Sequence, residues 1–169
     1  MIARLTLAIA LTLAAAPALA QSMPDPAHMP GEDAVDPYVV SDANAGGAPF
    51  TGPEMFEAFH GEAGVARIVD DMVDRNAADP RIAAIFARTD QVRLRRTLKE
   101  QFCYILGGPC RYSGRDMVLT HAQVGLQSAD MAPLIENLQA AMAAEGVPFR
   151  AQNRFLARMA PMKRDMITR

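Results

Sequence analysis

The sequence lacks the short signatures by which many enzymes are recognised. It contains no glycine-rich phosphate-binding loop, no HExxH zinc motif and no CxxCH motif. No pair of carboxylates stands out from the surface charge, and no basic cluster of the kind that binds nucleic acid is present. We therefore expect no nucleic-acid partner, and the few histidines and cysteines become the main candidates for chemistry.

The first 20 residues have the layout of an export signal. Arg4 precedes an apolar run at residues 5–16, and the small-residue pattern at residues 18–20 provides a cleavage site before Gln21. The alternative is a membrane anchor, but the apolar run is too short to span a bilayer. The sequence predicts a signal peptide at residues 1–20, export to the periplasm or the extracellular space, and no stable membrane insertion after cleavage.

Residues 21–52 are rich in proline, glycine, aspartate and alanine and show no helical apolar stripe. Such a composition buries too little apolar surface to offset the entropy lost on ordering. We therefore predict a disordered leader at residues 21–52. The remaining residues 53–169 are long enough for one domain with a single core.

The pattern of residues 53–169 is helical throughout. Apolar residues recur three and four positions apart, and no alternating run indicates a strand. Asp90 is placed to cap a longer helix, which Gly-Gly-Pro at residues 107–109 ends. Pro161 is expected to kink the last helix. These features predict an all-α domain of four substantial helices joined by short turns.

Cys103 and Cys110 lie on either side of this helix end. A chain reversal at the Gly-Gly-Pro break would bring their α-carbons close enough for a disulfide, which an oxidising compartment favours. The alternative is two buried free thiols. A thiol-disulfide redox module is a weaker interpretation, because redox motifs place their cysteines closer together and at the start of a helix.

His121 is the histidine best placed for chemistry. It follows Met117 and Leu119 on a short, partly apolar turn before a long helix. A neutral imidazole there could bind iron through one nitrogen while the other donates to a backbone carbonyl. The alternative is a core or capping histidine with no ligand role.

Several short elements, taken in order, resemble the group 1 truncated haemoglobins from about Phe56 to Ile167. The most specific is the run GGPxxYxGxxMxxxH at residues 107–121. The other matching elements are Gly61, Ala78-Asp79, Ile85-Phe86, Thr89-Asp90, Leu106, Gly146-Val147-Pro148 and Ala160-Pro161. The resemblance implies a truncated globin fold, in which the helices form a two-over-two sandwich.

The resemblance also implies a cofactor, haem b, and the residues that hold it. His121 takes the place of the iron ligand, and Phe86 matches the aromatic that packs on the porphyrin plane. Leu94 and Leu98 match distal positions, and Arg93 sits where a cation could reach a haem propionate, although a solvated helix face is the alternative. Family positions that line the cavity are occupied here by Phe102, Met117, Leu134, Met159 and also Met131.

The distal positions depart from the family pattern. Many relatives carry a tyrosine where this chain has Val73 and a glutamine where it has Leu98. An apolar distal pocket offers a gas ligand no hydrogen-bond donor. We therefore expect weak oxygen binding and ready oxidation of the iron, with less effect on CO or NO. Gln101 or Tyr104 turning inward would supply a substitute donor.

The resemblance implies an exported haem protein that binds diatomic gases, O2, NO or CO. Any enzymatic activity would be redox chemistry of NO and O2 at the haem, served by a redox partner. The alternative is a globin fold without haem that acts as a structural or interaction domain. The presence of both Phe86 and His121 argues against that alternative.

Overall fold

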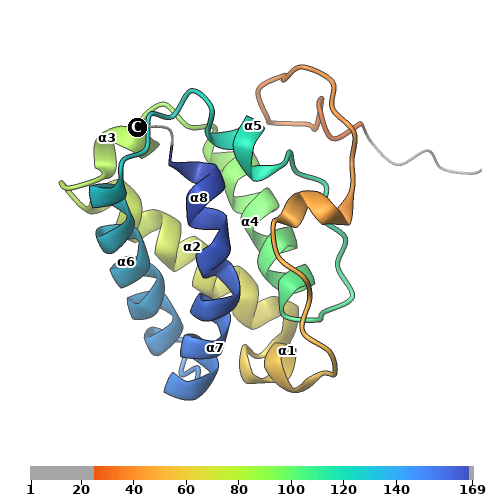
Figure 1. The fold of residues 1–169 in the computed structure, drawn as a ribbon, viewed down its shortest axis with the longest axis vertical. Helices are drawn as coiled ribbons and strands as arrows, with labels where there is room; N and C mark the ends of the chain where they lie inside the picture. Colours follow the sequence, from red (N-terminus) through yellow and green to blue (C-terminus); the bar gives the residue numbers. More distant parts are fainter. Residues whose placement is uncertain (1–24, 168–169) are drawn as a thin grey trace, which may run out of the picture.

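The chain is all-helical over residues 25–167, the part that our computed structural model describes, and no strand occurs there (Figure 1). The longer helices are α2 (Gly61–Ala78), α4 (Gln91–Ile105), α6 (Met131–Ala144) and α7 (Phe149–Met159). The shorter elements are η1 (Asp42–Ala45), α1 (Glu54–Ala58), α3 (Ala83–Phe86), α5 (Met117–His121), η2 (Ser128–Asp130), η3 (Ala160–Met162) and α8 (Lys163–Met166). The predicted fold class is confirmed. The predicted signal peptide lies outside the described residues, within which no helix is long and apolar enough to cross a membrane.

Local sequence explains where the longest segments begin and end. The Asp90 carboxylate accepts hydrogen bonds from the backbone N–H groups of Val92 and Arg93, at 2.9 and 3.0 Å, and so caps α4 as predicted. Gly107 ends this helix with φ 85°. Pro161 lies in η3, which separates α7 from α8 at the predicted kink.

Two helix pairs form the body of the domain, α2 with α4 and α6 with α7 (Figure 1). Helix α2 also packs against α6, and this contact brings the pairs together. Phe155 of α7 joins the pairs by edge-to-face contacts with Phe59 and Phe102, at centroid distances of 5.1 and 4.9 Å. All three rings are almost completely buried, and they form the centre of the core.

Residues 25–52, here called the strap, lie along α4 and α5 and continue down to α1 (Figure 1). The composition predicts a disordered leader, and the structure differs from that expectation. Ala27 and Ala45 are buried. The Tyr38 hydroxyl donates to the Ser113 carbonyl at 2.7 Å, and the Phe50 N–H donates to the Ile105 carbonyl at 2.8 Å. The strap is therefore part of the folded domain.

Charged groups of the domain explain why this polar segment is ordered. The Glu32 side chain is 1% exposed and forms ion pairs with Arg93 and Arg96 of α4, the first at 3.3 Å. A buried carboxylate of this kind needs charged or hydrogen-bonding partners. The composition of a segment indicates how much apolar surface that segment can bury by itself. It does not indicate that its charged partners, here the arginines of α4, lie elsewhere in the chain.

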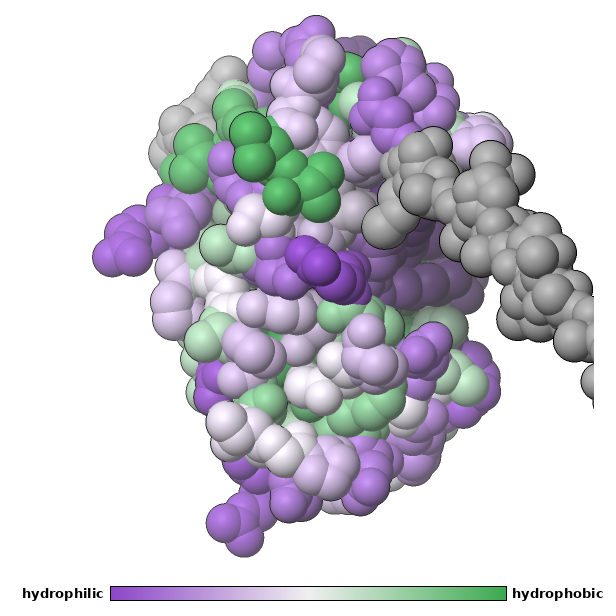
Figure 2. All heavy atoms as spheres, turned by 90° about the vertical axis from the view of Figure 1, so that its right-hand side faces the viewer, coloured by the Kyte–Doolittle hydropathy of each residue, from purple (hydrophilic) through white to green (hydrophobic). Residues whose placement is uncertain are grey.

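The face that carries the strap is largely polar (Figure 2). Hydrophilic and intermediate residues cover most of the visible part, and a strongly hydrophobic cluster lies near its upper end. Arg115 and Arg158 of the domain lie over the rings of Tyr38 and Phe50 in the strap, at 5.6 and 4.0 Å from the ring centroids. The strap thus places its two aromatic rings beneath cations.

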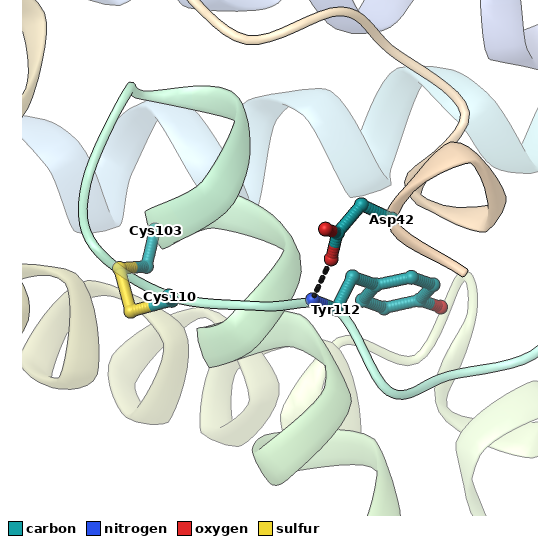
Figure 3. Close-up of a disulfide and its surroundings, with 4 residues drawn as sticks. All are labelled: Asp42, Cys103, Cys110 and Tyr112. Atoms are coloured by element: carbon teal, nitrogen blue, oxygen red, sulfur yellow. Dashed lines mark hydrogen bonds between the residues drawn. A yellow bond between two sulfur atoms is a disulfide. The ribbon is translucent and has the colours of Figure 1, made fainter. Parts of the chain in front are cut away.

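Cys103 and Cys110 are joined as a disulfide in the structure, with their α-carbons 5.7 Å apart (Figure 3). The bond ties the last turn of α4 to the loop that leads toward α5. Beyond it, the backbone N–H of Tyr112 donates to the carboxylate of Asp42 at 2.9 Å, so the strap holds the same loop from its other side.

Candidate functional site

A mostly apolar cavity of about 320 Å³ lies between α2, α4, α5, α6 and the C-terminal segment. Its size is at the lower end of the roughly 300–1,000 Å³ typical of small-molecule and cofactor pockets. It collects seven of the residues predicted to form a site, namely Phe86, Leu94, Leu98, Met117, His121, Leu134 and Met159. Met131 also lines it.

His121 enters the cavity wall from the end of α5. Asp116 starts this short helix by accepting a hydrogen bond from the Leu119 N–H at 2.8 Å. The Nδ1 atom of His121 lies 2.7 Å from the Met117 carbonyl oxygen. Because a carbonyl can only accept, Nδ1 carries the proton and Nε2 keeps its lone pair.

Burial favours the neutral form of this histidine. Loss of solvation lowers the pKa of His121, and the hydrogen bond to Met117 opposes this only in part. The neutral ring has one unprotonated nitrogen free for coordination, which is the form that binds metals. The described residues contain no group of three or more His, Cys, Asp or Glu side chains that could hold a metal ion. His121 is the one histidine among the described residues that line the cavity.

The strap supports α5 from behind. Gly46 of the strap has φ 78°, and a Cβ atom there would lie 3.0 Å from Cγ of Met117. Its neighbour Ala45 accepts a hydrogen bond from Nε2 of Gln101 at 2.8 Å. Gln101 is therefore held by the strap and does not act as the substitute donor considered from the sequence.

Three predicted site residues do not line the cavity. Val73 is completely buried in the core, and Phe102 is in contact with Phe155 there. Arg93 extends away toward the strap, where it donates to the carbonyl of Pro26 at 3.0 Å and to that of Asp33 at 2.9 Å. The direction of each side chain explains why these three residues lie outside the cavity wall. Matching a residue to a family position identifies its helix, but packing decides where its side chain points.

Several polar residues of the cavity wall were not identified as site residues from the sequence, and two of them matter most here. Asn76 lies one turn after Met72 on α2, and both line the cavity. Lys163 of α8 is the one basic side chain among the described lining residues. The i, i+4 spacing of Met72 and Asn76 indicates that both lie on one face of the helix. Asn76 was passed over because an asparagine near the end of a helix is usually taken as part of its termination.

A second hollow of about 590 Å³ lies between α2 and α4 beside the disulfide. It is more open, and its lining includes Arg95, Arg96 and Lys99. These cations are already paired with carboxylates: Arg95 and Lys99 with Asp70, and Arg96 with Glu32 and Glu100. Since its charges are matched within the protein, this hollow is a weaker candidate site.

Comparison with known proteins supports the same fold. Residues 54–168 match the family described as bacterial-like globins. The chain is 32% identical over 109 residues to a group 1 truncated hemoglobin of Nostoc commune, which covers 64% of this chain and 92% of the relative. It is 30% identical over 95 residues to a group 1 truncated hemoglobin of Tetrahymena thermophila, covering 56% and 78% of the two chains.

Solved structures extend the comparison to the backbone. The crystal structure of the truncated hemoglobin from Tetrahymena pyriformis in its Fe(III) form superposes with a TM-score of 0.65 at 26% identity, covering 68% of this chain and 98% of that one. A 2/2 hemoglobin from Synechococcus gives a TM-score of 0.62 at 23% identity over the same shares, which supports the fold alone. With the match over residues 54–168, these likenesses show that the chain belongs to the bacterial-like globins and has the two-over-two fold of the group 1 truncated haemoglobins.

Proposed function

We propose that this protein binds haem in the cavity through His121 and takes up diatomic gas ligands there. One observation carries the proposal: a partly buried histidine, whose Nδ1 is hydrogen-bonded to a backbone carbonyl so that Nε2 is free, stands at the wall of an apolar cavity. The relatives and structures named above are haemoglobins, and one of them is described in its Fe(III) form.

The lining residues fit such a group. Leucine, methionine and phenylalanine side chains suit the apolar faces of a porphyrin, and Phe86, which lines the cavity, would pack on its plane. Haem supplies an iron with a coordination position open to a gas ligand, and the polarity around that position decides how the ligand is held. Lys163 replaces Arg93 as the proposed partner of a propionate, because Arg93 is occupied by the strap.

The protein's own groups would do three things. His121 would orient the iron, since its hydrogen bond to Met117 fixes the ring. Leu94 and Leu98 would exclude water from the α4 side of the cavity and offer no hydrogen bond from that helix. This apolar side supports the expectation of weak oxygen binding and ready oxidation.

We also propose that the protein acts outside the cytoplasm. The layout of residues 1–20 supports export, and the Cys103–Cys110 bond is compatible with an oxidising compartment. The pair is proposed to be structural, because Cys103 is 2% exposed and the two cysteines lie at the end of a helix rather than at its start.

Absorption spectroscopy of the full chain with added haemin tests the central proposal. We expect stoichiometric binding with a Soret band that shifts on reduction and again with CO. His121→Ala should abolish this spectrum or change its type. His60→Ala is the matched control, because His60 is half exposed and pairs with Glu145 away from the cavity. If haemin fails to bind the unaltered chain stoichiometrically, the haem-free globin interpretation replaces this proposal.

A further inference from the structure

Asn76 is a buried amide with an unused hydrogen-bond donor. Its side chain lines the cavity from the last turn of α2, and the residue is 1% exposed. Its Oδ1 atom accepts a hydrogen bond from Nδ2 of Asn137 at 3.0 Å. Its own Nδ2 atom is shielded from solvent and has no hydrogen-bond partner among the described residues.

Neighbouring groups fix which way round this amide lies. Nδ2 of Asn137 also donates to Oδ2 of Asp79, at 3.3 Å. Hydrogen bonds with Arg81 hold the pKa of Asp79 well below its ordinary value, so its carboxylate is ionised and only accepts. Asn137 must therefore present its donor to both residues. Asn76 then presents its oxygen to Asn137 and keeps its N–H2 group for the cavity side.

The other uncharged polar side chains of the wall are committed. Gln101 donates to Ala45, and the hydroxyl of Thr89 donates to the Ile85 carbonyl at 3.3 Å. Thr120 has a long contact, 3.5 Å, with the Arg115 carbonyl. Buried donors in folded proteins nearly always have a partner, and each exception calls for an explanation. An incoming ligand that brings an acceptor atom is such an explanation.

We propose that Nδ2 of Asn76 donates a hydrogen bond to the gas ligand in the cavity, and so favours ligands with a partly negative outer atom. The inference rests on the proposed function, because haem would hold the ligand. Leu94 and Leu98 of α4 offer no donor, Gln101 of α4 is bonded to Ala45, and Asn76 of α2 supplies a free donor to the same cavity. The pocket thus keeps one hydrogen-bond donor, although Val73 and Leu98 stand where many relatives have a tyrosine and a glutamine.

Replacing Asn76 by leucine tests the inference. Asn76→Leu keeps the approximate shape, removes the donor, and leaves Asn137 bonded to Asp79. We expect the C–O stretching frequency of the CO complex to rise, because a donor near the ligand's oxygen weakens the C–O bond. Oxygen should dissociate about tenfold faster, which corresponds to the loss of one ordinary hydrogen bond.

Asn153→Leu is the matched control, since it makes the same exchange at an exposed position of α7 that does not line the cavity. It should leave both readouts near those of the unaltered protein. Equal frequencies and rates in Asn76→Leu and Asn153→Leu would overturn the inference. A donor satisfied by a trapped water alone would give that same result.

A measurement without mutation guards against a variant that fails to fold. Transfer of the unaltered CO complex from H2O to D2O should shift its vibrational frequencies, because the Asn76 amide protons exchange. No shift overturns the inference while the haem proposal stands. Failure of the unaltered chain to bind haem overturns both, so the two failures are distinguishable.

Discussion

The two walls of the cavity differ in how far their polar groups are committed within the protein. On the α5 wall, His121 is bonded to Met117, Asp116 caps the helix, and Gly46 of the strap packs behind it. On the α2 and α4 wall, the leucines need no partner and the Nδ2 donor of Asn76 has none among the described residues. One wall is arranged before any ligand arrives, and the other leaves room for a ligand to complete it.

The difference matches the demands of the two positions. A ligand to a metal works best when its ring orientation and tautomer are fixed in advance. A group that distinguishes between gas ligands must instead keep a hydrogen-bond donor unused by the protein, so that the donor is available to the bound ligand. The following changes test the strap, the α4 side of the cavity and His121 in turn.

The largest expected effect comes from the ion pairs between the strap and α4. Glu32→Ala removes the buried carboxylate that pairs the strap with Arg93 and Arg96, leaving two mostly buried cations with less compensation. We expect the free energy of unfolding to fall by about 2–3 kcal/mol, somewhat below the loss typical of a fully buried pair because Arg96 keeps Glu100. Denaturant titration measures the change.

Glu136→Ala provides the comparison for that variant. Glu136 pairs with Arg81 at 2.7 Å, but both side chains are more than half exposed. Removing such a pair should change the stability by less than about 1 kcal/mol. If the two variants lose the same stability, the strap contributes no more than a surface ion pair.

A smaller effect is expected from giving α4 a donor. Leu98→Gln places an amide on the apolar side of the cavity and should slow oxygen dissociation about tenfold, or roughly 1.4 kcal/mol. Leu94→Met, one turn earlier and close in volume, should leave the rate almost unchanged. Stopped-flow measurement of the two variants decides the matter, and equal rates would mean that Leu98 does not face the ligand.

The smallest effect concerns the charge state of His121 in the haem-free chain. Burial lowers its pKa in the folded state, so the unfolded chain takes up a proton first as the pH falls below about 6.5. Stability should therefore decline below that pH and level off once the folded protein is also protonated. Thermal unfolding at several pH values from about 7.5 to 5 follows the decline.

His121→Gln removes this part of the pH dependence and retains the other histidines, which contribute equally to both proteins. Subtracting the two curves isolates His121. Parallel curves would show that the imidazole is solvated in the folded protein, contrary to its position in the cavity wall.

The sequence was sufficient for the helices and for most of the cavity. Asp90 and the Gly-Gly-Pro break marked the ends of α4 because capping is a local property. Val73 and Phe102 were assigned to the cavity and lie in the core, because rotation of a helix about its axis depends on tertiary packing. The donor of Asn76 depends on Asn137, 61 positions away, and no local pattern indicates that contact.

The strap was missed for a related reason. Its residues bury little surface by themselves, and their partners belong to distant parts of the chain. The backbone N–H of Asp33 donates to the carboxylate of Asp90, which lies 57 positions away in the sequence. The carbonyl of Pro49 accepts a hydrogen bond from Arg158, which lies 109 positions away. Composition therefore predicted disorder for a segment whose order comes almost entirely from tertiary contacts.

These separations also set an order of events in folding. Contacts between distant positions require closure of long loops, which delays their formation relative to the helices. The carbonyl of Pro49 is bonded to Arg158 of α7, 109 positions further along the chain. The strap is therefore expected to pack last, after the helices that carry its partners have assembled.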